Sequence, residues 1–198
     1  IVDYKNGNKT FDLESNDASF FLDVFELNPN LKEGYLNIKG TEKDNSFNGK
    51  IILSDFIAYD TPFLTKILTF FSLDGLEQKV KGGGIYFNNL SSDYESYDNK
   101  IVLSNGLIRG SDLGLTFDGD LNIKTKDFFV EGTLIPAYTL NTLLTKVPIV
   151  GDIITAGSPE EGVLAATFNI ENKNDEIDIS FNPISVLVPS IIRNFLDF

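Results

Sequence analysis

The side chains that come closest to a catalytic or metal-binding pattern are three aspartates in a glycine-rich stretch, Asp112, Asp118 and Asp120. Neighbouring carboxylates can share general acid and base work, and a cluster of them can hold calcium. The stretch lacks the spacing and the terminal glutamate of an EF-hand loop, and aspartate beside glycine is ordinary turn chemistry. We expect solvated turns here, with a carboxylate hydrolase as the alternative.

The composition excludes most other catalytic classes. The 198 residues include no histidine and no cysteine, which excludes the commonest general base, thiol nucleophiles, thiolate metal sites and disulfides. No serine lies in a Gly-x-Ser-x-Gly pattern. Gly82 to Gly84 precedes strand-like residues rather than a Lys-Ser or Lys-Thr pair, which predicts a tight turn or bulge instead of a phosphate cradle. We therefore expect no enzyme activity, no metal and no cofactor.

The charge of the chain limits its partners. The net charge is −13 and the only arginines are Arg109 and Arg193, so the chain lacks the basic stripe that nucleic acids require. The same acidity opposes adhesion to an anionic leaflet but leaves apolar contact with uncharged or zwitterionic lipid surfaces open. No apolar run reaches the roughly 20 residues that span a bilayer. Because the chain begins with Ile1 and contains no Met, we expect it to be a piece of a longer protein.

A short internal repeat indicates how the chain is organised. Residues 34–39, GYLNIK, recur as GDLNIK at 119–124, and both copies predict strands. In each copy a further strand follows, and then a proline, Pro62 or Pro136, begins an apolar segment that predicts a helix. Each unit therefore reads as a hairpin followed by a Pro-started helix.

The region between the two copies predicts an antiparallel meander. Short strands are expected at 85–87, 100–103, 107–109 and 113–117. The polar, tyrosine-bearing stretch 91–99 is expected to be an exposed loop.

The segment 132–157 predicts two short apolar helices that begin at Pro136 and Pro148. Leu140, Leu143 and Leu144 recur at helical spacing, and Gly151 interrupts the second helix, which carries Ile153 and Ile154. Such helices either cap the open end of a sheet or contact lipid, and both roles are compatible.

The last part of the chain predicts two more strands and a terminal helix. Strands are expected at 162–170 and 176–181, joined by a polar turn at 171–175. Ile191, Ile192 and Phe195 then belong to an apolar series at helical spacing, which Pro189 breaks into two shorter pieces.

These elements predict a mainly β, α+β fold in a single domain, 1–198. Residues 1–131 are expected to form a β-meander with one helix at about 62–73. Residues 132–198 are expected to form a helical hairpin, two strands and a terminal amphipathic helix.

The C-terminal third resembles the C-terminal region of the bacterial AsmA-like family. The resemblance is carried by GTLIPAYTLNTLLTKVPIVGDIITAG, EGVLAATFNI and FNPISVLVPSIIRNF, and it extends more weakly upstream to about residue 30. The positions of the family's motif that we expect to be structural are Pro136, Asn141, Pro148, Gly151, Asn182, Pro183 and Pro189. The family often has glycine where this chain has Ser190, and its usual Gly-Pro turn is replaced by residues 172–174.

The resemblance implies a periplasmic module of a protein anchored in the inner membrane, with a curled antiparallel sheet whose apolar groove binds or conducts phospholipid toward the outer membrane. The Pro-started helices would close the groove. The expected contacts with acyl chains or a membrane surface are Leu140, Leu143, Leu144, Ile153, Ile154, Ile191, Ile192 and Phe195. The alternative is a module that docks onto an envelope protein during outer-membrane biogenesis and binds no lipid.

Overall fold

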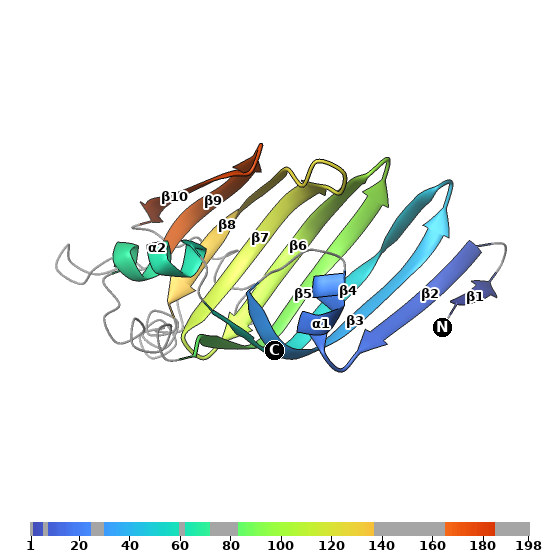
Figure 1. Ribbon diagram of the computed structural model, residues 1–198, viewed down its shortest axis with the longest axis horizontal. Helices are drawn as coiled ribbons and strands as arrows, with labels where there is room; N and C mark the ends of the chain where they lie inside the picture. The colour runs from blue at the N-terminus through green and yellow to red at the C-terminus, as the bar shows by residue number, and fades with distance from the viewer. Residues whose placement is uncertain are drawn as a thin grey trace, which may run out of the picture.

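The computed structural model contains one open antiparallel sheet of ten strands, which lie side by side in the order of the sequence (Figure 1). The structure describes residues 2–5, 8–24, 30–59, 62–71, 83–136 and 165–184. Because β1 and β10 are both edges, the sheet is not closed. The strands are β1 (Val2–Lys5), β2 (Asn8–Ser15), β3 (Leu31–Lys43), β4 (Ser46–Ala58), β5 (Ile85–Tyr97), β6 (Lys100–Gly110), β7 (Leu113–Asn122), β8 (Phe128–Pro136), β9 (Ala165–Lys173) and β10 (Glu176–Ile184).

The longest connections between strands lie at one end of the sheet, together with the two-residue turn 111–112, and the connections at the other end are all short. Three hairpins close at that other end through the residue pairs 44–45, 98–99 and 174–175, each an Asp and an Asn with positive φ between 45° and 65°. Two consecutive positive φ angles define the type I′ turn, which matches the twist of a hairpin and which Asn and Asp tolerate. We call this the turn end, and the end that bears the helices the loop end.

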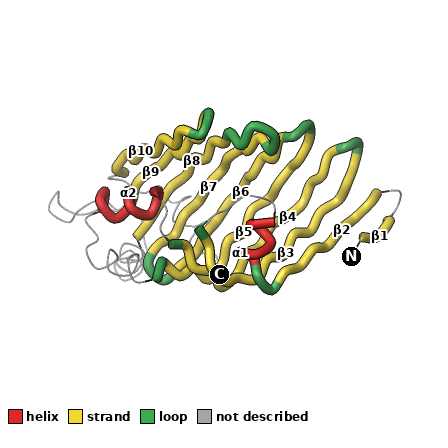
Figure 2. Tube along the Cα trace, in the orientation of Figure 1, coloured by secondary structure: helices red, strands yellow, loops and turns green. Residues whose placement is uncertain are grey.

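Two helices come from the loop end and lie on the same side of the sheet (Figure 2). Helix α1 (Ala18–Val24) follows β2, and Asp17 caps it by accepting hydrogen bonds from Ser19 Oγ at 2.7 Å and from the Phe20 N–H at 3.1 Å. These bonds hold the pKa of Asp17 below its ordinary value. Helix α2 (Pro62–Phe71) begins at the proline expected to start a helix at about 62–73.

The core lies between these helices and one face of the sheet, which we call the inner face. From the helices, Ala18, Leu64 and Ile67 are buried against it, and α2 also stacks Phe63 on Phe168 and Phe181. The sheet contributes Leu36, Leu53, Phe56, Ile85, Phe87, Leu113, Leu115, Phe117, Leu134, Ala166 and Phe168. Alternate residues of the strands therefore face inward, as expected for a sheet with one buried face.

Glycines on the inner face lie beneath aromatic rings of neighbouring strands. Gly40 pairs with Phe11 and Gly132 with Phe168, and a Cβ at either glycine would meet the ring of its partner within 3 Å. A ring that lies flat over a glycine supplies the contact that the missing side chain cannot, and glycine lets a sheet bend. These positions require glycine because a Cβ would also lie 1.9 Å from the Thr116 carbonyl oxygen at Gly132 and 2.3 Å from the Tyr94 hydroxyl oxygen at Gly40.

The expected loop at 91–99 is wrong, because residues 91–97 form the second half of β5 and only residues 98–99 turn. Ser92 and Tyr94 point inward and are 2% and 9% exposed, whereas Asp93 between them faces outward. The inward hydroxyl of Ser92 donates to the carbonyl oxygen of Ser104 at 3.0 Å, which satisfies a polar group that composition alone assigns to a loop.

Three further boundaries differ from the expectation. The strands expected at 100–103 and 107–109 are one strand, β6, with a register shift between Leu103 and Gly106. The turn expected at 171–175 is only two residues long, because β9 continues to Lys173. The division expected at residue 131 falls inside β8, which pairs along its length with β7.

Pro136 is not the first residue of a helix in the described part of the chain. It is the last residue of β8, buried opposite Leu113. The ladder between β8 and β9 ends two residues earlier, at the pair Leu134 and Ala166, so the missing N–H of Pro136 costs that ladder nothing. Proline therefore ends a strand here, a position that its sequence context cannot distinguish from a helix start.

Candidate functional site: an apolar strip on the inner face

All eight residues expected to contact lipid lie outside the described residues. This applies to Leu140, Leu143, Leu144, Ile153, Ile154, Ile191, Ile192 and Phe195, and to Asn141, Pro148, Gly151 and Pro189 of the family motif. Of the other motif residues, Asn182 and Pro183 are exposed members of β10, beyond the expected end of this strand at residue 181. The candidate site described below therefore consists of residues of the sheet.

The three aspartates do not form one site, and only Asp112 lies in a turn. Asp118 and Asp120 lie in β7, six and eight residues farther along, so at about 3.3 Å per residue roughly 20 Å separates Asp112 from Asp118. Asp118 accepts the backbone N–H of Asn105 at 2.9 Å, and Asp120 pairs with Lys100 at 3.3 Å. Two of the carboxylates therefore stabilise the sheet instead of converging on a substrate.

A row of inward positions crosses nine strands near the turn end. Each member is the cross-strand partner of the next, so the row is continuous from β2 to β10. Its members are Phe11, Gly40, Gly49, Tyr94, Leu103, Gly119, Val130, Ile170 and Ile179. At about 4.8 Å between strands, the row is roughly 38 Å long.

A second row runs parallel to the first, two residues closer to the turns. Its members are Lys9, Glu42, Phe47, Ser96, Ile101, Leu121, Phe128, Asn172 and Ile177. The two charges in this row neutralise each other, since Lys9 Nζ lies 3.2 Å from Glu42. The two rows also touch, because the Phe11 and Phe47 rings pack edge to face at 5.9 Å. We call the two rows together the apolar strip.

The strip keeps part of its surface open to solvent, unlike the rows at the loop end. Phe11, Phe47, Ile101, Leu103 and Phe128 are only partly buried. Ile177 is 54% exposed. Helix α2 reaches the strip at one edge, where Lys66 Nζ donates to the carbonyl oxygen of Ile179 at 2.8 Å. A partly open apolar surface of this length typically marks a binding site, so the strip is the candidate functional site.

The sequence contained a signal for this strip. Ile101 and Leu103, and likewise Phe128 and Val130, alternate with outward residues in the pattern of a half-buried strand. The alternation identifies residues of one strand that share a face. It does not say which residues of other strands continue the row, because that depends on the register of every hairpin.

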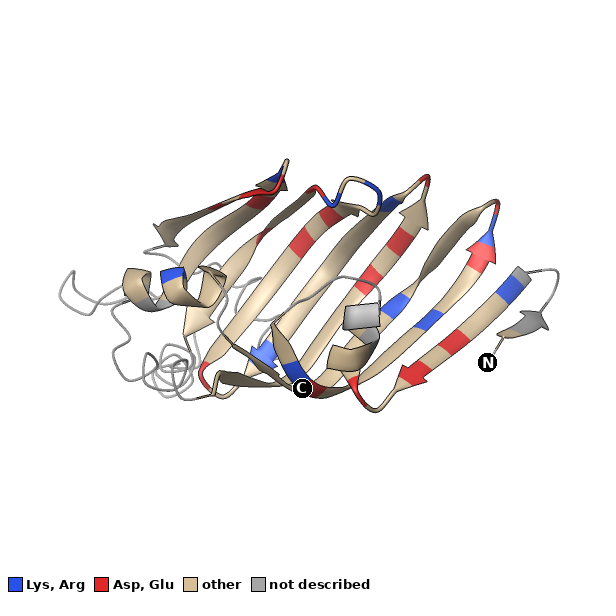
Figure 3. Cartoon of the chain, in the orientation of Figure 1, with Lys and Arg blue, Asp and Glu red and all other residues tan. Residues whose placement is uncertain are grey.

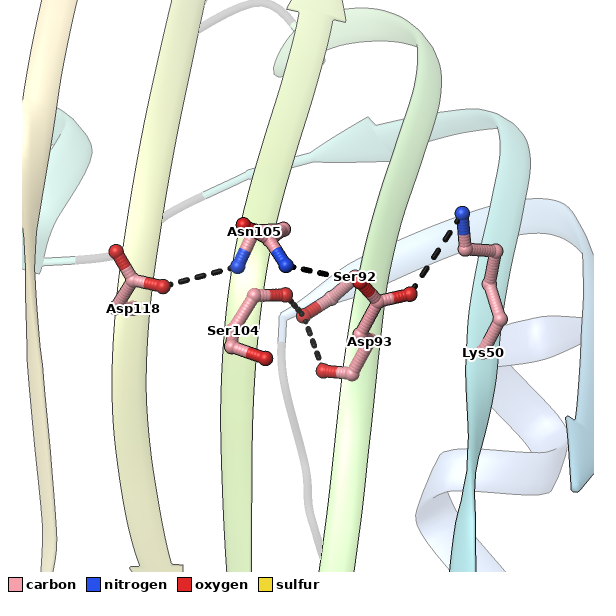
Figure 4. A network of polar contacts seen from close by, with 6 residues as sticks. All are labelled: Lys50, Ser92, Asp93, Ser104, Asn105 and Asp118. Atoms are coloured by element: carbon pink, nitrogen blue, oxygen red, sulfur yellow. Dashed lines mark hydrogen bonds and ion pairs between the residues drawn. The ribbon is translucent and has the colours of Figure 1, made fainter. Parts of the chain in front are cut away.

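The outer face is polar and is tied together across strands. Figure 4 shows one such network, in which Asn105 links Asp118 to Asp93, and Asp93 in turn pairs with Lys50. Asn105 has a φ of 53° and sits at the register shift in β6, so its backbone N–H and its amide both point to carboxylates. Figure 3 shows that most charged positions on the strands lie toward the turn end. The turn end of the sheet is therefore apolar on one face and charged on the other.

Tyr94 is the one tyrosine of the strip, and burial raises the pKa of its hydroxyl to about 12. Its Oη has no hydrogen-bond partner among the described residues. The folded state disfavours the phenolate, so this group's contribution to stability is complete below pH 10 and is lost as the pH rises through about 12.

We expect Tyr94→Phe to stabilise the fold by about 1 kcal/mol at pH 7, because a buried hydroxyl without a partner is costly. We also expect the variant to lose less stability than the parent between pH 10 and 12. Urea unfolding at pH 7, 9 and 11.5 measures both effects, with the exposed Tyr97→Phe as the matched control. Destabilisation by Tyr94→Phe at pH 7 would show that the hydroxyl has a partner.

No metal site or membrane-spanning helix accompanies the strip in the part of the chain that the structure describes. The acidic side chains there nowhere gather into a group of three or more that could hold a metal ion. Likewise, α1 and α2 are too short to cross a bilayer, and neither gives a candidate span. Comparison of the chain with protein-family models, with curated proteins and with solved structures found no match in any of the three.

Proposed function

We propose that this domain is a non-enzymatic lipid-binding module, in which the apolar strip holds phospholipid acyl chains. The observation that carries the proposal is the continuity of the strip over nine strands, with side chains that are mostly apolar, mostly partly exposed, and charged only at the ion pair of Lys9 and Glu42. An acyl chain spans about half of the roughly 30 Å hydrocarbon core of a bilayer. A strip of roughly 38 Å therefore has room for at least one acyl chain along its length.

The energetics of such binding need no catalytic group. Each methylene that leaves water contributes about 0.8 kcal/mol, so ten methylenes contribute about 8 kcal/mol. That gain must offset the loss of translational and rotational freedom on binding. A zwitterionic or uncharged headgroup suits a chain with a net charge of −13 better than an anionic one.

On the resemblance to the AsmA-like family, we propose that this activity belongs to the periplasm, within a protein anchored in the inner membrane. In this proposal the curled sheet forms a groove that conducts phospholipid toward the outer membrane. The helices expected after Pro136 and from Pro148 close one end of it, and the terminal helix contacts a membrane surface or an envelope protein.

The proposal is tested by lipid extraction and native mass spectrometry on the chain produced in a bacterial periplasm and purified without detergent. We expect phospholipid in a fixed ratio to the protein. A folded domain that is repeatedly free of lipid would contradict the proposal and would favour the alternative, a docking module for outer-membrane biogenesis.

A further inference from the structure

A polar cavity lies on the outer face of β2 to β5, opposite the apolar strip. Its volume is about 580 Å³, which is in the range of small-ligand sites. The backbones of Gly40 and Gly49 form part of its lining, together with polar and charged side chains of the four strands. The charged side chains in this lining suit a charged ligand.

Four charged side chains cross the cavity in the order acid, lysine, lysine, acid. The order follows the register, in which Asp12 pairs with Lys39, Lys39 with Lys50, and Lys50 with Asp93. The outer two pairings are ion pairs, with nitrogen to oxygen distances of 3.2 Å for Lys39 and 3.6 Å for Lys50. The central pairing places two lysines directly opposite each other, and like charges at such a pair are unfavourable in a sheet unless something neutralises them.

Both carboxylates are oriented by an asparagine in addition to their lysine. Asn37 Nδ2 donates to Asp12 at 2.8 Å, and Asn105 Nδ2 donates to Asp93 at 3.0 Å. Partial burial raises the pKa of Asp12, but the hydrogen bonds from Lys39 and Asn37 outweigh it and keep this pKa below its ordinary value. The Asp12 carboxylate is therefore charged at neutral pH. The cavity presents two lysine ammonium groups with one aspartate on each side of them.

We propose that this cavity binds a phosphate ester that carries a primary amine, the chemistry of phosphoethanolamine. The phosphate lies between the ammonium groups of Lys39 and Lys50, each of which has three N–H donors and an ion pair with one aspartate. The amine of the ligand donates to Asp12 or Asp93. The cavity has no net charge over these four residues, so it selects a zwitterion over a simple anion.

The spacing of the strands fits this ligand. Neighbouring strands lie about 4.8 Å apart, so the phosphate position and either aspartate are about one to two strand spacings apart. A two-carbon linker between phosphate and amine covers the shorter of these distances. The site is independent of the lipid-binding proposal, because it lies on the other face of the sheet.

Titration of the 15N-labelled chain with O-phosphoethanolamine tests the site, read from the amide shifts of Gly40 and Gly49. We expect saturable shifts in the millimolar range. Phosphocholine, whose quaternary amine has no N–H donor, should bind at least fivefold more weakly, and so should inorganic phosphate. Equal affinity for all three compounds, or no saturable shift, would overturn the proposal.

Two sets of variants separate the roles of the charges. Lys39→Gln with Lys50→Gln should abolish the shifts, whereas Lys100→Gln, which breaks a comparable outer-face pair outside the cavity, should leave them unchanged. Asp12→Asn with Asp93→Asn should weaken O-phosphoethanolamine at least fivefold while strengthening inorganic phosphate. If the aspartate variant changes both ligands in the same direction, the amine does not contact the carboxylates, and the proposal is wrong.

Vesicles distinguish a lipid headgroup from a soluble source of the same chemistry. Flotation with phosphatidylcholine vesicles that contain or lack phosphatidylethanolamine shows whether the headgroup is accessible to the cavity. Capture that requires phosphatidylethanolamine and is lost in the double lysine variant assigns the site to a membrane surface. Binding of soluble O-phosphoethanolamine without capture assigns it to a free ligand.

Discussion

Replacing Phe128 with serine is expected to remove most of the phospholipid that co-purifies with the chain, whereas replacing its neighbour Phe129 is expected to leave it in place. The two residues are consecutive in β8 and point to opposite faces, since Phe128 belongs to the apolar strip and Phe129 lies opposite the outward Asp120. Burying a phenylalanine side chain contributes about 1.5–3 kcal/mol, which corresponds to roughly a 10- to 100-fold change in affinity. Phospholipid per protein, measured after extraction, gives the result.

The comparison is controlled by its geometry. Both substitutions remove one aromatic ring from the same strand, so any general loss of stability in β8 affects both variants. Phe129 is 36% exposed and lies on the outer face. A second pair repeats the test on β6, with Ile101→Ser on the strip and Val102→Ser on the outer face. Equal loss of lipid in both members of a pair, with unchanged circular dichroism, would mean that the strip is not the binding surface.

Phe168→Ala is expected to destabilise the domain by about 3–5 kcal/mol, the usual cost of removing a buried phenylalanine. Phe168 is 3% exposed, packs its ring 5.1 Å from the ring of Phe63 in α2, and lies over Gly132 of the neighbouring strand. Its loss therefore leaves a cavity between α2 and the sheet, and also removes one of the two aromatic cross-strand partners of Gly132, leaving only Phe117 of β7. Urea unfolding measures the change.

Phe20→Ala is the matched control, because Phe20 lies in α1 with 68% of its surface exposed. We expect this change to stay within about 0.5 kcal/mol of the parent. A cost below about 1 kcal/mol for Phe168→Ala would show that α2 does not anchor the core at β9. It would leave the pairing of the strands untouched, since the pairing depends on backbone hydrogen bonds.

Residues 85–97 form one strand, although their composition changes halfway along it. The apolar residues at 85–87 predict a strand, and the polar composition of 91–97 predicts a loop, yet β5 runs through both. The missing information is nonlocal, because Ser92 and Tyr94 are acceptable inward residues only next to the strands that flank them. The Asp-Asn pair at 98–99 was the local signal, since two such residues fit a type I′ turn.

Pro136 illustrates the same limit from the other side. A proline followed by apolar residues is compatible with a helix start and equally with a strand end that needs no further donor. The register with Leu113 decides between them for the described residues. Pro62 does begin a helix, as predicted. Leu64 and Ile67 lie three residues apart in α2, and both are buried against the sheet.

By itself, the sequence determined the class of the fold, mainly antiparallel β with a helix from Pro62, because alternation and helical spacing are local patterns. It also excluded imidazole and thiol side chains from any site of this chain, since neither histidine nor cysteine is present. Only the tertiary structure decided which residues of nine strands form one apolar strip, and which four charges surround one cavity. These groupings depend on the register of every hairpin, and a shift of one residue in any strand would move its side chains to the opposite face.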